Sequence, residues 1–473
     1  MTAAVPSTEG ATAVARLAAF AAAFRAAPTE PALDDARQRL LDTIGISVPA
    51  LGTGPAAIVH QLARTWGGHA QSTALGLAEK VPAPTAALVN GTLGHALDFD
   101  DTHVPSILHP SASVVPAALA AAEACGASGR ELLAAIAVGN EICIRLGNAG
   151  YDPAINNSVF FERGLHATSI CGALGSAAAA ATVMGLPEDQ IAHAMGIAAS
   201  MGAGLLEANR AGGSVKRMHC GWAAHSGVVA AQCADAGLTG PPTVLEGRFG
   251  FFHAYCGETY DEAALLDGLG EVWATGDCFV KPYPTNVFTH SGIDAALALR
   301  AQGLKPEEIE SVEIGVPSPV LRTIAQPREA KVRPESGYHA QFSGPFTFAI
   351  ALGGGGGLGV YLDDFTDEQV ADPVLLDLAS RITHVADPRC DEIFPSHFPS
   401  IVRVQTKDGR ELVEEVLTTR GTSERPLSDD EIMLKFRLNA AGLPGGADEI
   451  GRRIADVASY DDVSRLLEGT TAS

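Results

Sequence analysis

The sequence is poor in charged, basic and aromatic side chains. Only 18% of its 473 residues are charged and 6% are aromatic, and 32 Lys and Arg stand against 55 Asp and Glu, which gives a formal net charge of −23. This excess of negative charge disfavours phosphate backbones and anionic membrane surfaces, so we expect neither nucleic acid nor membrane as a partner. Any anionic substrate would need a local cluster of cations.

Cysteine pairs and targeting signals are also lacking. The eight cysteines are scattered and form no C-x-x-C pair, which is typical of reduced thiols rather than a disulfide frame or a zinc knuckle. No basic and apolar leader is evident in Met1–Gly10, and the Ala-rich run at 171–186 is too short to span a bilayer. We therefore expect a cytoplasmic protein.

Several well-known site motifs are missing as well. The chain has no G-x-G-x-x-G after a strand, no Walker A sequence, no G-x-S-x-G elbow, and no H-E-x-x-H or EF-hand spacing. These absences argue against a nucleotide-binding loop, a serine hydrolase elbow and the metal sites of defined geometry.

Hydrophobic residues make up 47% of the chain, and most of them lie in Ala-rich helical patterns. Pro and Asp at helix starts and Gly at helix ends delimit these segments. The small residues on their faces predict a tightly packed bundle. The expected helices are 12–27, 31–48, 54–66, 82–97, 114–124, 129–148, 166–184, 187–203 and 215–236.

The pattern changes near Cys278. Segments 309–315, 401–406 and 411–418 alternate as strands, the last two as a hairpin, and helices are expected at 290–303 and 343–352. Helices return after Pro426, including one over 447–468. We therefore predict a mainly α protein with a large all-helical domain built from both chain ends and a smaller inserted α+β lid domain. The expected boundaries are 1–277, 278–422 and 423–473.

The densest titratable cluster is Gly94–Pro110, GHALDFDDTHVPSILHP, with three Asp and three His in an otherwise apolar region. Such groups are costly near a core unless they are paired or used in chemistry. Asp and His can also bind a metal, but their spacing here matches no defined metal motif. An acid/base site is the favoured interpretation, and no metal is expected.

Two further segments share this design, because each places polar residues at the start of an Ala-rich helix. They are GLHATS, with His166, and GGSVKRMH, with Lys216. Helix N-termini favour anions, so the three starts would form a carboxylate site if they converge; the alternative is three separate capping loops. Lys281, in FVKPYPT, either points into an interdomain cleft or lies on the surface.

The sequence resembles the MmgE/PrpD family in a series of motifs that occur in the same order from about Leu40 to Leu417. These motifs are HALDFDDTH with HPSASVVPAALA, then GLHATS, then KRMHCGWAAHSG with GLTGP, and then KPYP…H…IDAAL. This family includes 2-methylcitrate dehydratase, cis-aconitate decarboxylase and iminodisuccinate epimerase. The resemblance implies an all-helical domain with an α+β lid, a homodimer, a site in the cleft, and no metal or organic cofactor.

The resemblance also implies the site residues. His109 would be the general acid or base, Lys216 and Lys281 would bind carboxylate and stabilise developing charge, and His166 would donate to substrate or relay a proton. Asp98 and Thr102 would orient these groups. Which of the two His and two Lys is the base stays open. Asp100, Asp101 and His103 are expected to cap or pair nearby groups.

Three positions depart from the family pattern. Trp222 and Val287 stand where many members have Arg, and Phe346 stands where decarboxylase-type members have Tyr. If these residues line the pocket, it suits a less charged or larger substrate than a tricarboxylate. If they lie outside it, the changes carry no such meaning.

The expected function is a cofactor-independent lyase that abstracts a proton next to a carboxylate or carbonyl of a small molecule and eliminates water, in the manner of 2-methylcitrate dehydratase. The first alternative is an epimerase or isomerase of an iminodisuccinate-like acid. The second is dehydration with conjugate addition, a cyclisation, on a larger metabolite. Decarboxylation is weakened by Phe346. The non-enzyme alternative is an inactive homologue that still binds ligand.

Overall fold

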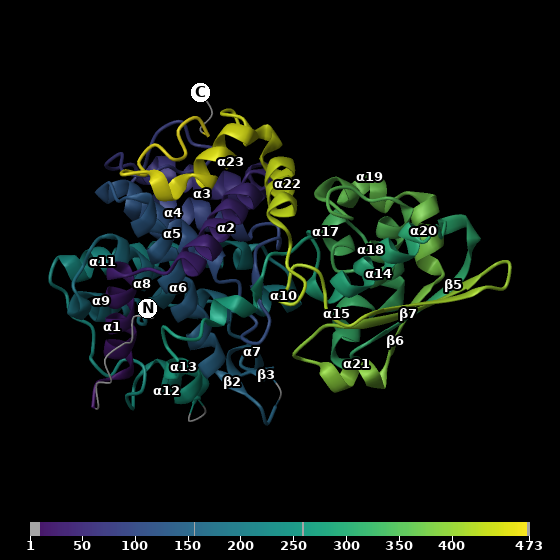
Figure 1. The fold of residues 1–473 in the computed structure, drawn as a ribbon, viewed down its shortest axis with the longest axis horizontal. Helices are drawn as coiled ribbons and strands as arrows, with labels where there is room; N and C mark the ends of the chain where they lie inside the picture. Colours follow the sequence, from purple (N-terminus) through teal and green to yellow (C-terminus); the bar gives the residue numbers. More distant parts are fainter. Residues whose placement is uncertain (1–9, 156, 258–259, 471–473) are drawn as a thin grey trace. The chain divides into compact units, whose positions relative to one another are not determined.

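The computed structural model describes residues 10–155, 157–257 and 260–470 and is mainly α, which confirms the predicted fold class (Figure 1). The chain divides into two compact units, one of residues 1–278 with 436–473, and one of residues 279–435. The absence of a leader sequence was inferred from Met1–Gly10, and residues 1–9 of that stretch lie outside the described residues.

The first unit is a bundle of Ala-rich helices. Short helices and short strands lie between the long helices along the chain. They are α7 (Val159–Glu162), α10 (Glu207–Ala211), α12 (Phe251–Cys256) and α13 (Glu262–Leu266), with the strands β1 (Thr102–His103), β2 (Tyr151–Asp152) and β3 (Asn157–Ser158). The long helices are α1 (Ala13–Ala26), α2 (Glu30–Ser47), α3 (Gly54–Trp66), α4 (Ala83–His95), α5 (Ser111–Cys125), α6 (Gly129–Ala149), α8 (Ala167–Val183), α9 (Glu188–Ala198) and α11 (His219–Asp235).

The core of this bundle is formed by α4, α5, α8 and α11, which pack on one another, while α6 lies against α8 (Figure 1). Small residues allow this close packing. A Cβ on Gly221 of α11 would stand 2.3 Å from the carbonyl oxygen of Leu88 on α4, so these two helices approach at backbone distance. Helix α6 is long and apolar enough to cross a membrane, but 94% of its apolar window is buried inside the structure, which marks it as a core helix.

Several expected helices differ at their ends. The helix expected at 114–124 begins earlier, at Ser111, because the cluster before it supplies hydrogen bonds to its first turn. The one expected at 215–236 begins later, because residues Val215–Met218 form a separate 3-10 helix, η2. The helix expected at 447–468 is shorter, since α23 covers only Ala447–Ala455.

The second unit carries a four-stranded sheet in the order β6-β5-β7-β8. Strands β5 (Ile309–Val316), β7 (Ser400–Thr406) and β8 (Glu411–Val416) confirm the three predicted strands, and β7 and β8 form the predicted antiparallel hairpin. Strand β6 (Ile382–Ala386), which pairs in parallel with β5, was not predicted. The predicted helices appear as α14 (His290–Ala301) and α18 (Gly344–Gly353), which share a hydrophobic core with the sheet.

Shorter helices complete this unit, and β4 (Cys278–Phe279) lies where the first unit passes into it. Helix α22 (Asp429–Asn439) carries the chain back to the first unit, where α23 packs against α2. The shorter helices are α15 (Leu321–Ile324), α16 (Arg328–Val332), α17 (Gly337–Ala340), α19 (Asp367–Val370), α20 (Pro373–Ser380) and α21 (Pro388–Ile393).

Candidate active site

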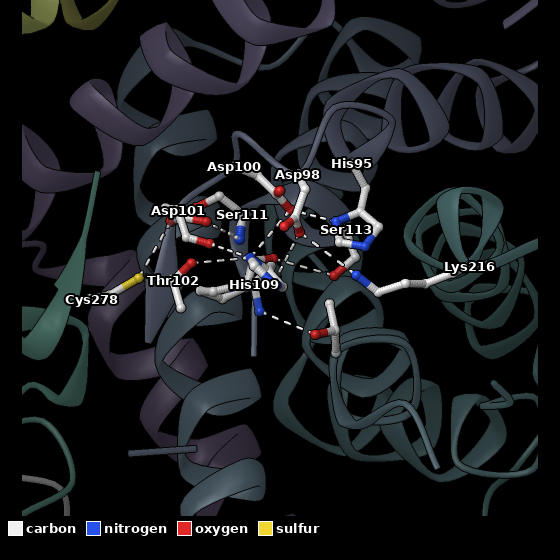
Figure 2. A network of polar contacts seen from close by, with 12 residues as sticks. His95, Asp98, Asp100, Asp101, Thr102, His109, Ser111, Ser113, Lys216 and Cys278 are labelled. Atoms are coloured by element: carbon white, nitrogen blue, oxygen red, sulfur yellow. Dashed lines mark hydrogen bonds and ion pairs between the residues drawn. The ribbon is translucent and has the colours of Figure 1, made fainter. Parts of the chain in front are cut away.

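The end of α4 and the loop before α5 bring His95, His109 and the three Asp residues of Gly94–Pro110 into one polar network (Figure 2). The backbone of this loop turns sharply at two non-glycine residues, Asp98 with φ 54° and Ile107 with φ 53°. Asp tolerates this left-handed conformation better than most residues, whereas Ile does not. The loop therefore holds a conformation that local preference alone would not select.

Asp101 fixes this loop to the start of α5. Its carboxylate accepts hydrogen bonds from the backbone N–H of Ser111 at 3.2 Å and from the Ser111 hydroxyl at 2.6 Å, and Arg39 of α2 lies 3.4 Å away. Burial raises the pKa of Asp101 to about 6, and the Arg39 charge opposes that rise. The Cys278 thiol donates to the same carboxylate at 3.5 Å (Figure 2). Asp101 is thus a structural anchor.

His103 is likewise engaged inside the loop. Its Nδ1 lies 2.7 Å from the Ser106 hydroxyl and accepts the backbone N–H of Ser106 at 3.3 Å. Its side chain is buried, and burial lowers its pKa to about 3, with Arg39 adding to the effect. The ring is therefore neutral at physiological pH and serves the loop rather than proton transfer.

His109 is held in a single tautomer by backbone geometry. Its Nδ1 lies 2.8 Å from the carbonyl oxygen of Asp101 and 3.2 Å from the hydroxyl of Thr102, while its own backbone N–H donates to Thr168 of α8. A carbonyl can only accept, so Nδ1 carries a hydrogen and the neutral ring keeps its lone pair on Nε2. The His109 side chain is 14% exposed, so it is not fully buried in the core.

Asp98 links His109 to Lys216. Its Oδ1 lies 3.9 Å from Nε2 of His109 and 3.6 Å from Nζ of Lys216, and all three side chains are partly exposed (Figure 2). Lys216 comes from η2, which leads into α11. Residues from two distant parts of the sequence therefore place an imidazole, a carboxylate and an ammonium group side by side, as acid/base chemistry requires.

His166 is placed one layer deeper, directly before α8. Its ring is buried, and its Nδ1 lies 3.0 Å from Nδ1 of His219, the first residue of α11. Burial lowers the pKa of His166 well below its usual range, with Lys216 as the next cause, and lowers that of His219 to about 4. Two neutral imidazoles joined through their Nδ1 atoms share one hydrogen, so the tautomer of each ring depends on the other.

The structure therefore brings Asp98, Thr102, His109, His166 and Lys216 together in the first unit. It also shows the partners of three residues that the sequence segments contain but that were not predicted to be catalytic or substrate-binding, His95, Asp100 and His219. Asp100 was expected to cap or pair a nearby group, and it pairs with His95.

Trp222 is 40% exposed on α11, and its ring stacks on His225 at 5.2 Å between centroids. His225 in turn lies 2.9 Å from the carbonyl oxygen of Pro84. These contacts lie outside the histidine and carboxylate network, and both alternatives for Trp222 stay predictions.

The remaining predicted residues belong to the second unit. Lys281 is buried in the KPYP segment, which Tyr283 anchors through a 2.6 Å hydrogen bond to Asp294 of α14. Val287 is half-buried at the start of the 3-10 helix η4 (Val287–Thr289). Phe346 is fully buried in the first turn of α18 and is part of the hydrophobic core. Their roles toward substrate stay predictions.

A metal ion would compete with hydrogen bonds already present. His95, Asp100 and His109 offer ligand atoms that all lie within 4.8 Å of one another. Metal binding needs the lone pair of a ring nitrogen, and Nδ1 of His109 carries a hydrogen toward Asp101, so only Nε2 of that ring could be a ligand. The expectation that no metal is bound stays a prediction.

Comparison with known proteins agrees with the sequence resemblance. Residues 15–263 match the MmgE/PrpD N-terminal domain and residues 283–459 match the MmgE/PrpD C-terminal domain. The chain is 30% identical to cis-aconitate decarboxylase of Homo sapiens over 93% of this chain and 91% of that protein, and 28% identical to that of Mus musculus over 93% and 90%. The Aspergillus terreus protein of the same name is 27% identical over 83% of this chain and 82% of its own length. These similarities support a lyase-type enzyme, and they confirm the resemblance: the chain belongs to the MmgE/PrpD family.

Proposed function

We propose that this protein is a lyase that moves a proton at a carbon next to a carboxylate or carbonyl group of a small acid and eliminates water, without a cofactor. The observation that carries the proposal is the orientation of His109. Its Nδ1–H is committed to the Asp101 carbonyl at 2.8 Å, so that Nε2, beside Asp98 and Lys216, is the basic nitrogen.

In this reaction Nε2 of His109 takes the proton from the α-carbon. The electrons of the broken C–H bond form a double bond to the β-carbon, the bond from that carbon to its hydroxyl oxygen breaks, and an acid supplies the proton that completes the water molecule. Lys216, 3.6 Å from Asp98, is a suitable acid and also balances the charge that develops on the substrate carboxylate. Lys281 would bind a second carboxylate of the substrate, as the family resemblance implies.

A second candidate is decarboxylation, which the names of the relatives favour. There the bond between the substrate carbon and its carboxylate breaks, carbon dioxide leaves, and an acid of the same site protonates the carbon. Phe346 argues against this candidate, since it cannot supply the hydroxyl that the family resemblance associates with decarboxylation. Epimerisation would use the same proton abstraction without a leaving group.

The test is an incubation of the protein in D2O with methylcitrate, citrate, cis-aconitate or iminodisuccinate, followed by NMR. Deuterium at the carbon next to a carboxylate together with loss of water supports the proposal. Release of carbon dioxide from cis-aconitate would replace it with decarboxylation, and stereochemical scrambling alone would replace it with epimerisation. If none of these acids exchanges or reacts, the small-acid proposal is wrong.

A further inference from the structure

His95 is a ring neighbour of two imidazoles at the candidate site, His109, which is the proposed base, and His166. It is the last residue of α4, and its ring centroid stands 5.1 Å from that of His109 and 5.6 Å from that of His166. His109 and His166 come from different elements, the loop before α5 and the start of α8. The His95 ring is therefore a neighbour that the two imidazoles share.

A single carboxylate anchors this ring. Oδ2 of Asp100 lies 2.7 Å from Nδ1 of His95, and both side chains are only 1% exposed (Figure 2). An ionised carboxylate only accepts, so Nδ1 of His95 carries the hydrogen. The same oxygen is 3.6 Å from Nδ1 of His109. One negative charge in a water-poor region thus acts on two of the three rings, where its effect is strongest.

Buried polar groups usually have a hydrogen-bond partner, and Nε2 of His95 is an exception. Within the described chain Nε2 of His95 is buried and has no hydrogen-bond partner. An apolar ring at this position would leave no unsatisfied ring nitrogen, but it would remove the hydrogen-bond donor of the buried Asp100 carboxylate. A costly arrangement of this kind beside proposed acid/base groups indicates a functional constraint rather than packing alone.

We propose that His95, held by Asp100, is a positioning residue that sets the orientation of the His109 and His166 rings, while the Asp100 carboxylate balances the positive charge that His109 carries during proton transfer. The proposal rests on the proposed function and extends it to two residues that do not reach the substrate themselves. The groups that face this cluster are Asp98, Asp101 and Thr102 of the loop, Lys216 of η2, and His219 and Cys220 of α11.

Two variants test the contact between His95 and Asp100, one at each residue. Asp100→Asn keeps the shape of the side chain and removes its charge, while His95→Phe keeps a ring and removes its nitrogens. Each is expected to lower kcat for proton exchange by about 10- to 100-fold with KM nearly unchanged, since neither residue binds substrate. Because the Asp100 charge favours protonated neighbouring rings, Asp100→Asn is also expected to shift the acidic limb of the pH–kcat profile to lower pH. The double variant is expected to be no slower than the slower single one.

His60→Gln is the matched control, because His60 is also a buried histidine of the first unit, with Nε2 2.8 Å from the Leu75 carbonyl, but it lies outside this network. It is expected to change stability and to leave kcat and the pH profile unchanged. If Asp100→Asn and His95→Phe also leave kcat and the pH profile unchanged, the proposal is wrong. If His95→Phe fails to fold, the nearly isosteric Asp100→Asn decides by the same criteria.

NMR separates this proposal from the proposed function. Imidazole nitrogen signals of the wild-type protein are expected to show His95 with hydrogen on Nδ1, and Asp100→Asn is expected to shift the signals of both His109 and His166. These signals do not depend on turnover. A wild type that exchanges none of the acids would refute the proposed function alone, whereas signals of His109 and His166 that are identical in wild type and Asp100→Asn would refute the positioning role.

Discussion

At the scale of single residues, the candidate site depends on which nitrogen of each imidazole is basic. The Asp101 carbonyl fixes Nδ1–H of His109, and the His219 ring constrains His166. Neither partner could be identified from the sequence, because a backbone carbonyl leaves no signal and His219 resembles a core histidine. The segments that carry His109, His166 and Lys216 could be predicted from the sequence, but the tautomers of the two histidines could not.

Asp98→Asn tests the link between His109 and Lys216. Asn also tolerates the left-handed backbone at this position, so the loop is expected to keep its conformation. Loss of the negative charge leaves Lys216 and the protonated form of His109 without their shared partner, and we expect kcat for α-proton exchange to fall by about 10- to 100-fold. Asp34→Asn, at a surface ion pair with Arg37, is the control and should retain full activity. An Asp98→Asn enzyme as fast as wild type would exclude this role.

His103 is expected to make the protein sensitive to acid. Its pKa is near 6.5 in the unfolded chain and about 3 in the folded one, so below pH 6.5 the unfolded state binds the extra proton. Its contribution to stability is complete above pH 6.5 and is lost progressively as the pH falls toward 3. His103→Asn, whose amide oxygen can still accept from Ser106, should therefore gain about 1 to 2 kcal/mol relative to wild type between pH 6.5 and 5. Urea unfolding at both pH values measures this, and parallel pH dependences would contradict it.

At the scale of elements, helices were predictable and their exact ends were not. The Ala-rich periodicity located the long helices, but η2 separates Lys216 from α11, and α5 begins at Ser111 because Asp101 supplies its first hydrogen bonds. Strand β6 was missed because its pairing with β5 joins segments about 70 residues apart, and its five residues carry a weak pattern. These differences arise from tertiary contacts that local sequence does not encode.

The close approach of α4 and α11 predicts a strong effect of one methyl group. A Cβ on Gly221 would lie 2.3 Å from the Leu88 carbonyl oxygen and 2.3 Å from the Thr92 hydroxyl, so Gly221→Ala must separate the two helices. We expect a loss of about 1 to 3 kcal/mol in the free energy of unfolding. Gly52→Ala, where an added Cβ meets nothing within 4 Å, should change it by less than about 0.5 kcal/mol. Equal stability of the two variants in urea would show that the helices do not pack this closely.

At the scale of the whole molecule, the fold class and the family could be predicted because ordered motifs recur along most of the chain. The site could be predicted in part, since its helix starts carry polar clusters. The His166–His219 pair forms only when α8 and α11 are packed together, whereas His95 and Asp100 pair locally at the end of α4. The net charge of −23 leaves the binding of an acidic substrate to local cations such as Lys216.

Nε2 of His109 is the proposed base, and the most direct test of this role compares wild type with His109→Gln in D2O. The rate of deuterium incorporation next to the carboxylate of a substrate acid is measured by NMR, with circular dichroism and thermal unfolding as checks of the fold. A folded His109→Gln protein is expected to lose essentially all exchange, by at least about 100-fold. Exchange at the wild-type rate in the folded variant would show that another group abstracts the proton.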